Sequence, residues 1–406
     1  MSKKESGTGS VRQRKNGSWE GQYYLEGKRK SVYGKTQDEV RIKLNVIIAE
    51  IMSNEYLDES QIPFSEWLET WLEQYAKPTV RHSTYVTYYD YCHNHIIPAL
   101  GKKKMKELNG DILQRFFNEK TKSGRLDGRP GGLSAKSLKN LRNVLSLVFK
   151  QAVLNQIIKE NPLNAVKTPK KENKEMRVLT ISEQEALEQI VFSSHNATAV
   201  GIVISLYTGL RIGELLGLQW NDVDLAHSKS LRVRRILIRE RNPDKNDPDY
   251  IVLKRSEKTS LMLGKLKTEK ANRTIYLPDV VIEMFERLKS RQGILAKQYG
   301  EGFNPNSFVI CNDVGDAIEP RTYMDVLSNF TKVAGIEHAN FHSLRHTFAT
   351  RAIEMKMDLN TLSDIMGHAQ PSTTLNMYGH SLDEQKKLEM SKFNKTRRND
   401  MYGGTA

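Results

Sequence analysis

Cysteine is scarce in this sequence of 406 residues, where only Cys92 and Cys311 occur. Two cysteines exclude a disulfide-based scaffold and a zinc module built from clustered cysteines. Long apolar runs are missing too, and none approaches the roughly 20 residues that cross a bilayer as a helix. The first ten residues, MSKKESGTGS, lack the apolar core of a secretion signal. We therefore expect a multidomain protein of the reducing cytoplasm.

Positive charge is in excess and is distributed unevenly. The chain has 62 lysines and arginines against 48 acidic residues, a net charge of +14. Residues 1–36 contain nine basic and three acidic residues, and residues 62–170 contain 18 basic and nine acidic residues, whereas residues 171–406 are nearly balanced. Basic side chains placed on phosphates release condensed counterions, which favours nucleic-acid binding by the first two segments. A merely solubilising surface is the alternative, because net charge alone is weak evidence.

Residues 1–60 predict a small antiparallel sheet covered by a helix. Asn16-Gly17 is a tight-turn signal between strand-like runs at 10–15 and 18–25, and a third run follows at 30–33. Thr36 and Glu39 have the spacing of a capping box for a helix over 37–53. The face of the sheet away from the helix could enter the major groove of DNA, as a β-ribbon does. A protein-interaction module is the alternative.

Basic and aromatic side chains on that open face and its turns are the candidate DNA contacts of this segment. They are Arg12, Arg14, Lys15, Trp19, Tyr23, Lys28 and Lys30.

Residues 62–168 predict a domain of four helices with apolar stripes at helical spacing. Ser83 is expected to open the second helix and Ser134 to cap the fourth. The charged stretch 169–176 is expected to be a linker. The candidate phosphate contacts of the helical domain are Lys102, Lys103, Lys104, Lys136, Lys139 and Arg142.

Residues 177–380 predict a mostly helical domain with a small antiparallel sheet, followed by a tail over 381–406. Strand-like runs occupy 230–238, 250–253 and 274–277, and the segment 239–266 is long enough to hold an insertion. Helices are expected near 182 and over 199–208, 280–298, 324–333, 341–355 and 358–366. The expected fold class is therefore multidomain α+β.

Arg211 and Glu214 stand directly after the apolar helix 199–208. A glutamate three residues after an arginine could orient the guanidinium fork toward a phosphate. An ordinary surface ion pair is the alternative reading of this spacing.

His342 and Arg345 have a spacing that places both on one face of a helix. An imidazole and a guanidinium on one face can share a phosphate. A zinc site would use His342 with His346, but the glutamate of an HExxH motif is missing. A structural, hydrogen-bonded histidine is the other alternative.

A nucleophile and an acid are the remaining needs of phosphate chemistry. Tyr378 lies in the run TTLNMYGH, and a phenol with a pKa near 10 needs a neighbouring base or cations to attack at neutral pH. Lys267 is a candidate acid in a segment, 265–275, whose pattern predicts a β-hairpin, although Lys265 and Lys270 are close alternatives.

Together these motifs resemble the tyrosine recombinase (lambda-type integrase) family. The matching strings are GLRIGELLGLQWNDVD at 209–224, LKTEKANRTIYLP at 266–278, HSLRHTFAT at 342–350 and MGHAQPSTTLNMYGH at 366–380. Four strings in the right order make a specific match to the catalytic domain. The N-terminal sheet and the helical domain are more loosely similar to the arm-binding and core-binding domains of integrases from conjugative transposons and Gram-positive phages.

The resemblance implies a covalent reaction at phosphorus. Tyr378 would attack the scissile phosphate, giving a 3′-phosphotyrosyl link and a free 5′-hydroxyl. Lys267 would protonate the departing 5′ oxygen, and His342 would handle the tyrosine proton. No metal or nucleotide cofactor is implied, because the covalent intermediate conserves the bond energy for rejoining.

The resemblance also implies a clamp for the phosphate and a set of partners. Arg211 and Arg345 would hold the non-bridging oxygens, His368 would support them, and Glu214 would orient Arg211. Double-stranded DNA with core and arm attachment sites would be the substrate, recombined by a homotetramer through a Holliday junction. An excisionase-type directionality factor and a host DNA-bending protein are further expected partners, with the protein on the bacterial nucleoid when bound to DNA.

Two other functions remain open at this point. A type IB topoisomerase would share the active-site chemistry but relaxes DNA as a monomer and needs no arm domain. A DNA-binding regulator could use the same fold without cleaving DNA. The complete set of catalytic residue types argues against the regulator.

Overall fold

The structure is a computed structural model that describes residues 9–25, 28–52, 61–169, 176–194, 196–244, 247–266, 268–368 and 390. The chain divides into two compact units, Met1–Glu172 and Asn173–Ala406, and the boundary falls within the charged stretch 169–176. No helix in the described part of the chain is both long and apolar enough to cross a membrane.

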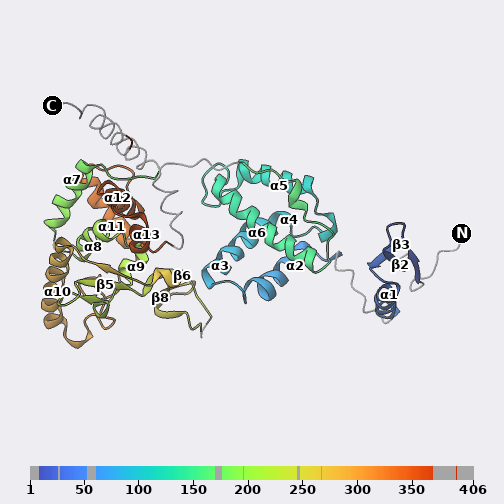
Figure 1. The fold of residues 1–406 in the computed structure, drawn as a ribbon, viewed down its shortest axis with the longest axis horizontal. Helices are drawn as coiled ribbons and strands as arrows, with labels where there is room; N and C mark the ends of the chain where they lie inside the picture. The colour runs from blue at the N-terminus through green and yellow to red at the C-terminus, as the bar shows by residue number, and fades with distance from the viewer. Residues whose placement is uncertain are drawn as a thin grey trace, which may run out of the picture. The chain divides into compact units, whose positions relative to one another are not determined.

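The N-terminal segment is a three-stranded antiparallel sheet with one helix, as predicted (Figure 1). Its strands are β1 (Gly9–Gln13), β2 (Trp19–Leu25) and β3 (Lys28–Gly34), with β2 in the centre, and α1 spans Gln37–Met52. The backbone N–H of Glu39 donates to the Thr36 hydroxyl at 3.2 Å, which confirms the N-terminal cap. Val40 and Leu44 of α1 are buried against the sheet.

The prediction that Trp19 and Tyr23 lie on the open face of this sheet is wrong. Side chains alternate between the two faces of a strand, and a Cβ on Gly21 would lie 2.8 Å from Val40 of α1. Tyr23, two residues on, therefore faces the helix and is only 4% exposed. Trp19 and Lys30 share this face by the register of β2 and β3.

The open face of the sheet instead carries the residues of opposite parity. Arg12 forms an ion pair with Glu20 at 2.8 Å, and the guanidinium of Arg14 lies 5.3 Å from the ring centre of Tyr33. A charged and aromatic open face is therefore present, with Tyr33 in place of Tyr23.

The helical part of the first unit is a bundle with its own apolar core (Figure 1). Phe64 stacks on Phe149 with ring centres 5.3 Å apart, and both are fully buried. Ser134 caps the last long helix by accepting from the N–H of Ser137, as predicted, whereas the second helix begins at His82 and not at Ser83. The helices are α2 (Phe64–Thr70) continued by η2 (Trp71–Ala76), α3 (His82–Tyr91) continued by η3 (Cys92–Ile96) and α4 (Ile97–Leu100), then η4 (Met105–Glu107), α5 (Gly110–Ser123), α6 (Ala135–Leu154) and η5 (Pro162–Ala165).

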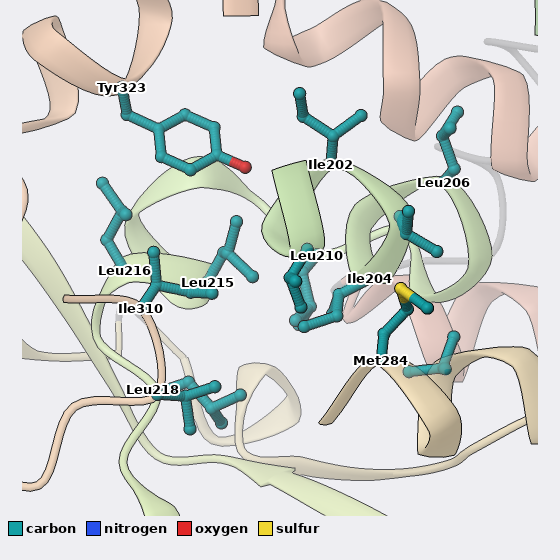
Figure 2. Packing of buried hydrophobic residues seen from close by; sticks show 14 of the residues in the cluster. Ile202, Ile204, Leu206, Leu210, Leu215, Leu216, Leu218, Met284, Ile310 and Tyr323 are labelled. Atoms are coloured by element: carbon teal, nitrogen blue, oxygen red, sulfur yellow. The ribbon is translucent and has the colours of Figure 1, made fainter. Parts of the chain in front are cut away.

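The second unit is built around α8 (Ala197–Thr208), which is buried along nearly its whole length. It packs against α7 (Ile181–Phe192), α10 (Asp279–Tyr299), α11 (Pro320–Val333) and α12 (Phe341–Glu354). Figure 2 shows its residues Ile202, Ile204 and Leu206 in the core that also contains Tyr323. This packing fixes the ends of α8 and α12, where the candidate site lies. The remaining helices are α9 (Ile212–Leu216), η6 (Trp220–Asp222), η7 (Glu269–Ala271), η8 (Gly300–Gly302) and α13 (Leu359–Met366).

Two small antiparallel sheets are present in this unit, where the sequence predicts one. The first has the order β4-β5-β9 and the second β6-β8-β7. The predicted strand 230–238 is divided at Arg234, because Arg234 and Arg235 both turn toward the buried carboxylate of Asp222. The strands are β4 (Val223–Asp224), β5 (Ser230–Val233), β6 (Arg235–Arg241), β7 (Tyr250–Arg255), β8 (Thr259–Lys265) and β9 (Arg273–Tyr276).

The predicted hairpin over 265–275 is also wrong. Strand β8 pairs with β6 and β7, whereas β9 pairs with β5, so the two strands that flank this segment belong to different sheets. The sequence does not predict β8, because the polar residues at 256–260 lead into it. The segment 239–266 thus provides most of a sheet of its own.

Candidate active site

Arg211 is placed by a sharp turn at the end of α8. Gly209 ends that helix in the left-handed conformation, with φ of 64°, and a Cβ there would lie 2.6 Å from Phe348. Leu210 is fully buried, and Arg211 then occupies the N-cap position of α9. Glycine is required at 209 both for the positive φ and for the close packing.

Glu214 holds Arg211 in place from within the protein. One carboxylate oxygen accepts from the Arg211 backbone N–H at 3.0 Å, and the other accepts from its Nη1 at 2.7 Å. Glu214 is only 2% exposed, which excludes the surface ion pair that the spacing also allowed. The bond to Nη1 restrains the guanidinium fork, and the bond to the backbone N–H holds the residue that carries it.

Helix α12 carries His342, Arg345 and His346. Asn340 caps the helix by accepting from the N–H of Ser343 at 3.2 Å. Arg345 is 2% exposed and donates to the carbonyls of Gly209 and Met366, the second at 2.6 Å. The arginine therefore joins the ends of α8 and α13.

His368 follows α13 and completes the group. Arg345 Nη2 lies 3.0 Å from Nε2 of His368, which is 7% exposed. A guanidinium can only donate, so Nε2 of His368 accepts and its ring proton is on Nδ1.

The two arginines converge on one turn. Arg345 donates to the carbonyl of Met366, and Arg211 Nη2 lies 3.4 Å from the carbonyl of Gly367. Two segments more than 130 residues apart in the sequence thus place their guanidinium groups on consecutive peptide units. Two guanidinium groups held at one turn raise the positive potential there, which favours an anion.

The histidines near the two arginines favour the neutral form. Desolvation and the nearby charges of Arg345 and Arg211 lower the pKa of His342 below its usual range. Burial, with His342 and Arg345, lowers the pKa of His346 to about 4. Burial, with Arg345 and Arg211, lowers the pKa of His368 to about 4. Near pH 7 these imidazoles are neutral, and the positive charge belongs to the arginines.

Arg273 is a buried member of the site that the sequence motifs do not reveal. It begins β9 and forms an ion pair with Glu214 at 2.9 Å. The signal in the sequence is the alternation of that strand, in which Arg273 and Ile275 occupy the buried positions.

The candidate nucleophile and acid, Tyr378 and Lys267, lie outside the described residues. Of the alternative lysines, Lys265 forms an ion pair with Asp249 at 2.9 Å. Across the described ranges, no cluster of three or more histidine, cysteine, aspartate or glutamate side chains is arranged to hold a metal ion.

The candidate DNA contacts of the helical bundle differ in their surroundings. Lys102, Lys136 and Lys139 are exposed. Lys104 is exposed and lies 3.4 Å from the side-chain oxygen of Gln61. Arg142 is half-buried and donates to the carbonyl of Leu163, so part of its fork binds within the bundle.

Solved structures share this fold. The chain aligns with the Tn1549 transposon integrase in complex with transposon right end DNA at a TM-score of 0.62 and 23% identity, covering 82% of this chain and 99% of that one. It aligns with a lambda integrase tetramer bound to a Holliday junction at a TM-score of 0.55 and 18% identity, covering 90% and 94%. The fold is that of the lambda-type integrases.

Curated sequences are similar over most of the chain. The tyrosine recombinase XerC-like protein of Caldanaerobacter subterraneus is 27% identical over 88% of this chain and 89% of its own length. The ICEBs1 integrase of Bacillus subtilis is 25% identical over 64% and 65%.

Two family models match the chain. The phage integrase family matches residues 177–385, and the N-terminal SAM-like domain of phage integrases matches residues 63–121. The chain belongs to the phage integrase family. It is a tyrosine recombinase, an enzyme that performs site-specific DNA strand transfer.

Proposed function

We propose that the chain is the integrase of a mobile element, such as a conjugative transposon or a prophage, and that it uses Tyr378 as its nucleophile. The observation that carries this proposal is the convergence of Arg211 and Arg345 on the turn at Met366 and Gly367. That turn is followed within a dozen residues by Tyr378.

The two arginines would bind the non-bridging oxygens of the scissile phosphate. Phosphoryl transfer spreads negative charge over these oxygens in the transition state, so fixed cations lower the barrier. Both guanidinium groups are held by the protein before DNA binds: Arg211 by Glu214, and Arg345 by two carbonyls and His368. Little reorganisation is then needed during the reaction.

Proton transfer would involve three side chains. Tyr378 forms the new bond from its oxygen to phosphorus while the bond to the 5′ oxygen breaks. His342, whose lowered pKa keeps it neutral, would take the phenol proton. Lys267 would give a proton to the leaving 5′ oxygen, a role for which Lys265 is less suited because it pairs with Asp249.

The energy of the broken bond stays in the phosphotyrosyl link. A 5′-hydroxyl from another strand can attack that link and release the tyrosine. Strand exchange therefore requires neither a metal nor a nucleotide cofactor.

The three parts of the chain would divide the DNA contacts. Residues 1–60 would bind arm sites through Arg12, Arg14, Lys15 and Lys28. Residues 62–168 would bind the core site through the exposed lysines at 102, 104, 136 and 139. Lys103 and Arg142 would add contacts at the same domain, and residues 177–380 would carry the chemistry.

A tetramer would assemble on two core sites and pass through a Holliday junction. The solved relative that is bound to such a junction supports this assembly. The tail 381–406, which lies outside the described residues apart from Met390, would dock on a neighbouring subunit. A directionality factor and a host bending protein would select integration or excision.

A two-site recombination assay tests the proposal. Purified protein is incubated with plasmids that carry the two ends of the element, and the products are separated by size. Recombinant products that require both ends support an integrase. Relaxed plasmid without recombinants would support a topoisomerase, and binding without either product would support a regulator.

A further inference from the structure

Arg273 is a buried arginine to which the proposed chemistry assigns no role. Its side chain is 6% exposed at the start of β9. Two of its nitrogens face the carboxylate of Glu214: Nη2 donates to Oε2 at 2.9 Å, and Nη1 lies 3.3 Å from Oε1. Two bonds go to backbone carbonyls, from Nη1 to Ala271 at 3.0 Å and from Nε to Ile365. The fork is thus directed at the protein and not at the solvent.

One carboxylate serves two arginines at this point. Each oxygen of Glu214 faces one group of Arg273 and one group of Arg211. The three side chains together carry a net charge of +1. If Glu214 served Arg211 alone, the pair would be neutral and would attract a phosphate less strongly.

Arg273 also supports the turn that receives Arg211. Gly367 has φ of 61°, and a Cβ there would lie 2.8 Å from Arg273 Nη1. The carbonyl of Gly367 faces Arg211 Nη2 at 3.4 Å. Arg273 therefore touches both groups that hold Arg211, namely the carboxylate of Glu214 and the turn at 365–367.

We propose that Arg273 is a positioning residue that acts through Glu214 and the turn at 365–367 to fix Arg211 and to keep its charge available to the scissile phosphate. This inference rests on the proposed role of Arg211 at that phosphate. Two other roles are testable alternatives: a purely structural one, and an action on Lys267 through the contact with Ala271 in the adjoining segment.

The first experiment measures single-turnover cleavage of a nicked DNA that carries the element end. Full-length Arg273→Met and Arg273→Lys are compared with wild type, and DNA affinity and the unfolding temperature are measured for each. The control is Arg287→Met, which removes an arginine from a surface ion pair with Glu283 on α10. Such exposed pairs contribute little to stability.

We expect Arg273→Met to cleave about 100-fold more slowly, because a small displacement of Arg211 would cost a factor of that size. Its DNA affinity should be unchanged. Arg273→Lys keeps the positive charge but lacks the guanidinium fork. Its cleavage rate should fall about 10-fold, a loss that is common when a residue supporting a functional group is changed. Should Arg273→Met unfold at the assay temperature, Arg273→Lys decides the matter, since a wild-type rate for this variant would overturn the proposal.

The second experiment separates Arg211 from Lys267. In a substrate with sulfur at the bridging 5′ position, Tyr378 forms its bond to phosphorus, the bond to sulfur breaks, and the thiolate leaves without a proton from an acid. A rate loss caused by a misplaced Arg211 remains with this substrate. A rate loss caused by a misplaced Lys267 disappears, because the thiolate needs no acid. We expect the loss in Arg273→Met to remain, and full recovery would overturn the proposal.

The third experiment is a double-mutant cycle with Glu214→Gln. If Arg273 acts through Glu214, Arg273→Met should slow Glu214→Gln much less than it slows wild type. Fully additive losses would overturn the proposal. A wild type that cleaves no DNA at all would overturn the proposed function together with this inference, whereas normal cleavage by both Arg273 variants would overturn the inference alone.

Discussion

At the scale of single residues, the site contains arginines that have protein partners before DNA arrives, Arg345 buried and Arg211 partly exposed. Arg345 is 2% exposed and has carbonyl partners from two helix ends. A buried guanidinium needs such partners because desolvating an unpaired charge is costly. The same partners fix the direction of its guanidinium group.

Arg345→Ala should therefore remove most of the catalytic activity. Loss of a fixed donor to the transition state typically costs about 100-fold or more in rate. Single-turnover cleavage measures this loss, and Arg321→Ala is the matched control, because Arg321 forms an exposed ion pair with Asp325 on α11. Equal rates in Arg345→Ala and the control would remove Arg345 from the clamp.

Acid should destabilise the catalytic unit through His346 and His368. Burial lowers the pKa of both histidines to about 4, so below pH 6.5 the unfolded chain binds protons that the folded chain excludes. Stability is then fully present above pH 6.5 and falls as the pH drops toward 4, by at most about 1.4 kcal/mol per pH unit for each histidine.

Calorimetric unfolding temperatures at pH 7, 6 and 5 test this prediction, with His346→Asn beside wild type. The variant should lose less stability than wild type between pH 7 and pH 5. An identical pH dependence would show that His346 does not contribute.

At the scale of elements, buried apolar side chains hold the helices in position. In α6, the stripe that includes Leu145 and Val148 is fully buried, whereas Leu147 is 41% exposed. Helical spacing in the sequence predicts this pattern, because residues three and four apart share a face. Helix α8 is different, since it is buried all round, and no periodic stripe distinguishes its faces.

Leu145→Ala and Leu147→Ala form a matched pair for this point. Removing the buried leucine should cost about 2–5 kcal/mol of folding free energy, and removing the exposed one should cost within about 0.5 kcal/mol. Denaturant unfolding followed by tryptophan fluorescence measures both. Similar losses in the two variants would contradict the packing of α6.

Much of the fold follows from local signals, and the errors have physical causes. Thr36 and Ser134 cap their helices as the sequence predicts, because a cap needs only a few neighbouring residues. The division of the strand at Arg234 depends on Asp222, which no local pattern reveals. The predicted face of Tyr23 is wrong because alternation gives two faces without saying which one the helix covers.

For the site, as for the fold, the sequence reveals features that depend on neighbouring residues and not those that depend on distant contacts. Arg211, Glu214, His342 and Arg345 stand out by type and spacing. Arg273 does not, because its importance comes from a contact with Glu214 across 59 positions of the sequence. Distant ion pairs of this kind become visible only once the fold is known.

At the scale of the whole molecule, positive charge is distributed unevenly along the chain. The N-terminal segments carry most of the excess positive charge, whereas the second unit is nearly neutral. Each phosphate that a basic side chain neutralises adds about 0.9 to the slope of binding against salt concentration. The basic segments should therefore dominate the salt dependence of DNA binding.

Deleting residues 1–60 should abolish arm-site binding and leave cleavage at the core site intact. The salt slope should fall by about 0.9 for each phosphate that the shortened protein no longer neutralises. Gel-shift titrations at several salt concentrations, together with cleavage of a core-only substrate, measure both effects. Loss of core cleavage in the deletion would show that the domains do not divide the work in this way.

The central claim is that Tyr378 attacks DNA in a site built around Arg211 and Arg345. The most direct test is a nicked suicide substrate carrying the element end, incubated with wild type and Tyr378→Phe and analysed in SDS. We predict a covalent protein–DNA adduct in wild type, attached at Tyr378 by mass spectrometry of the linked peptide, and none in the variant. An adduct at another residue, or a specific footprint without any adduct, would contradict the account.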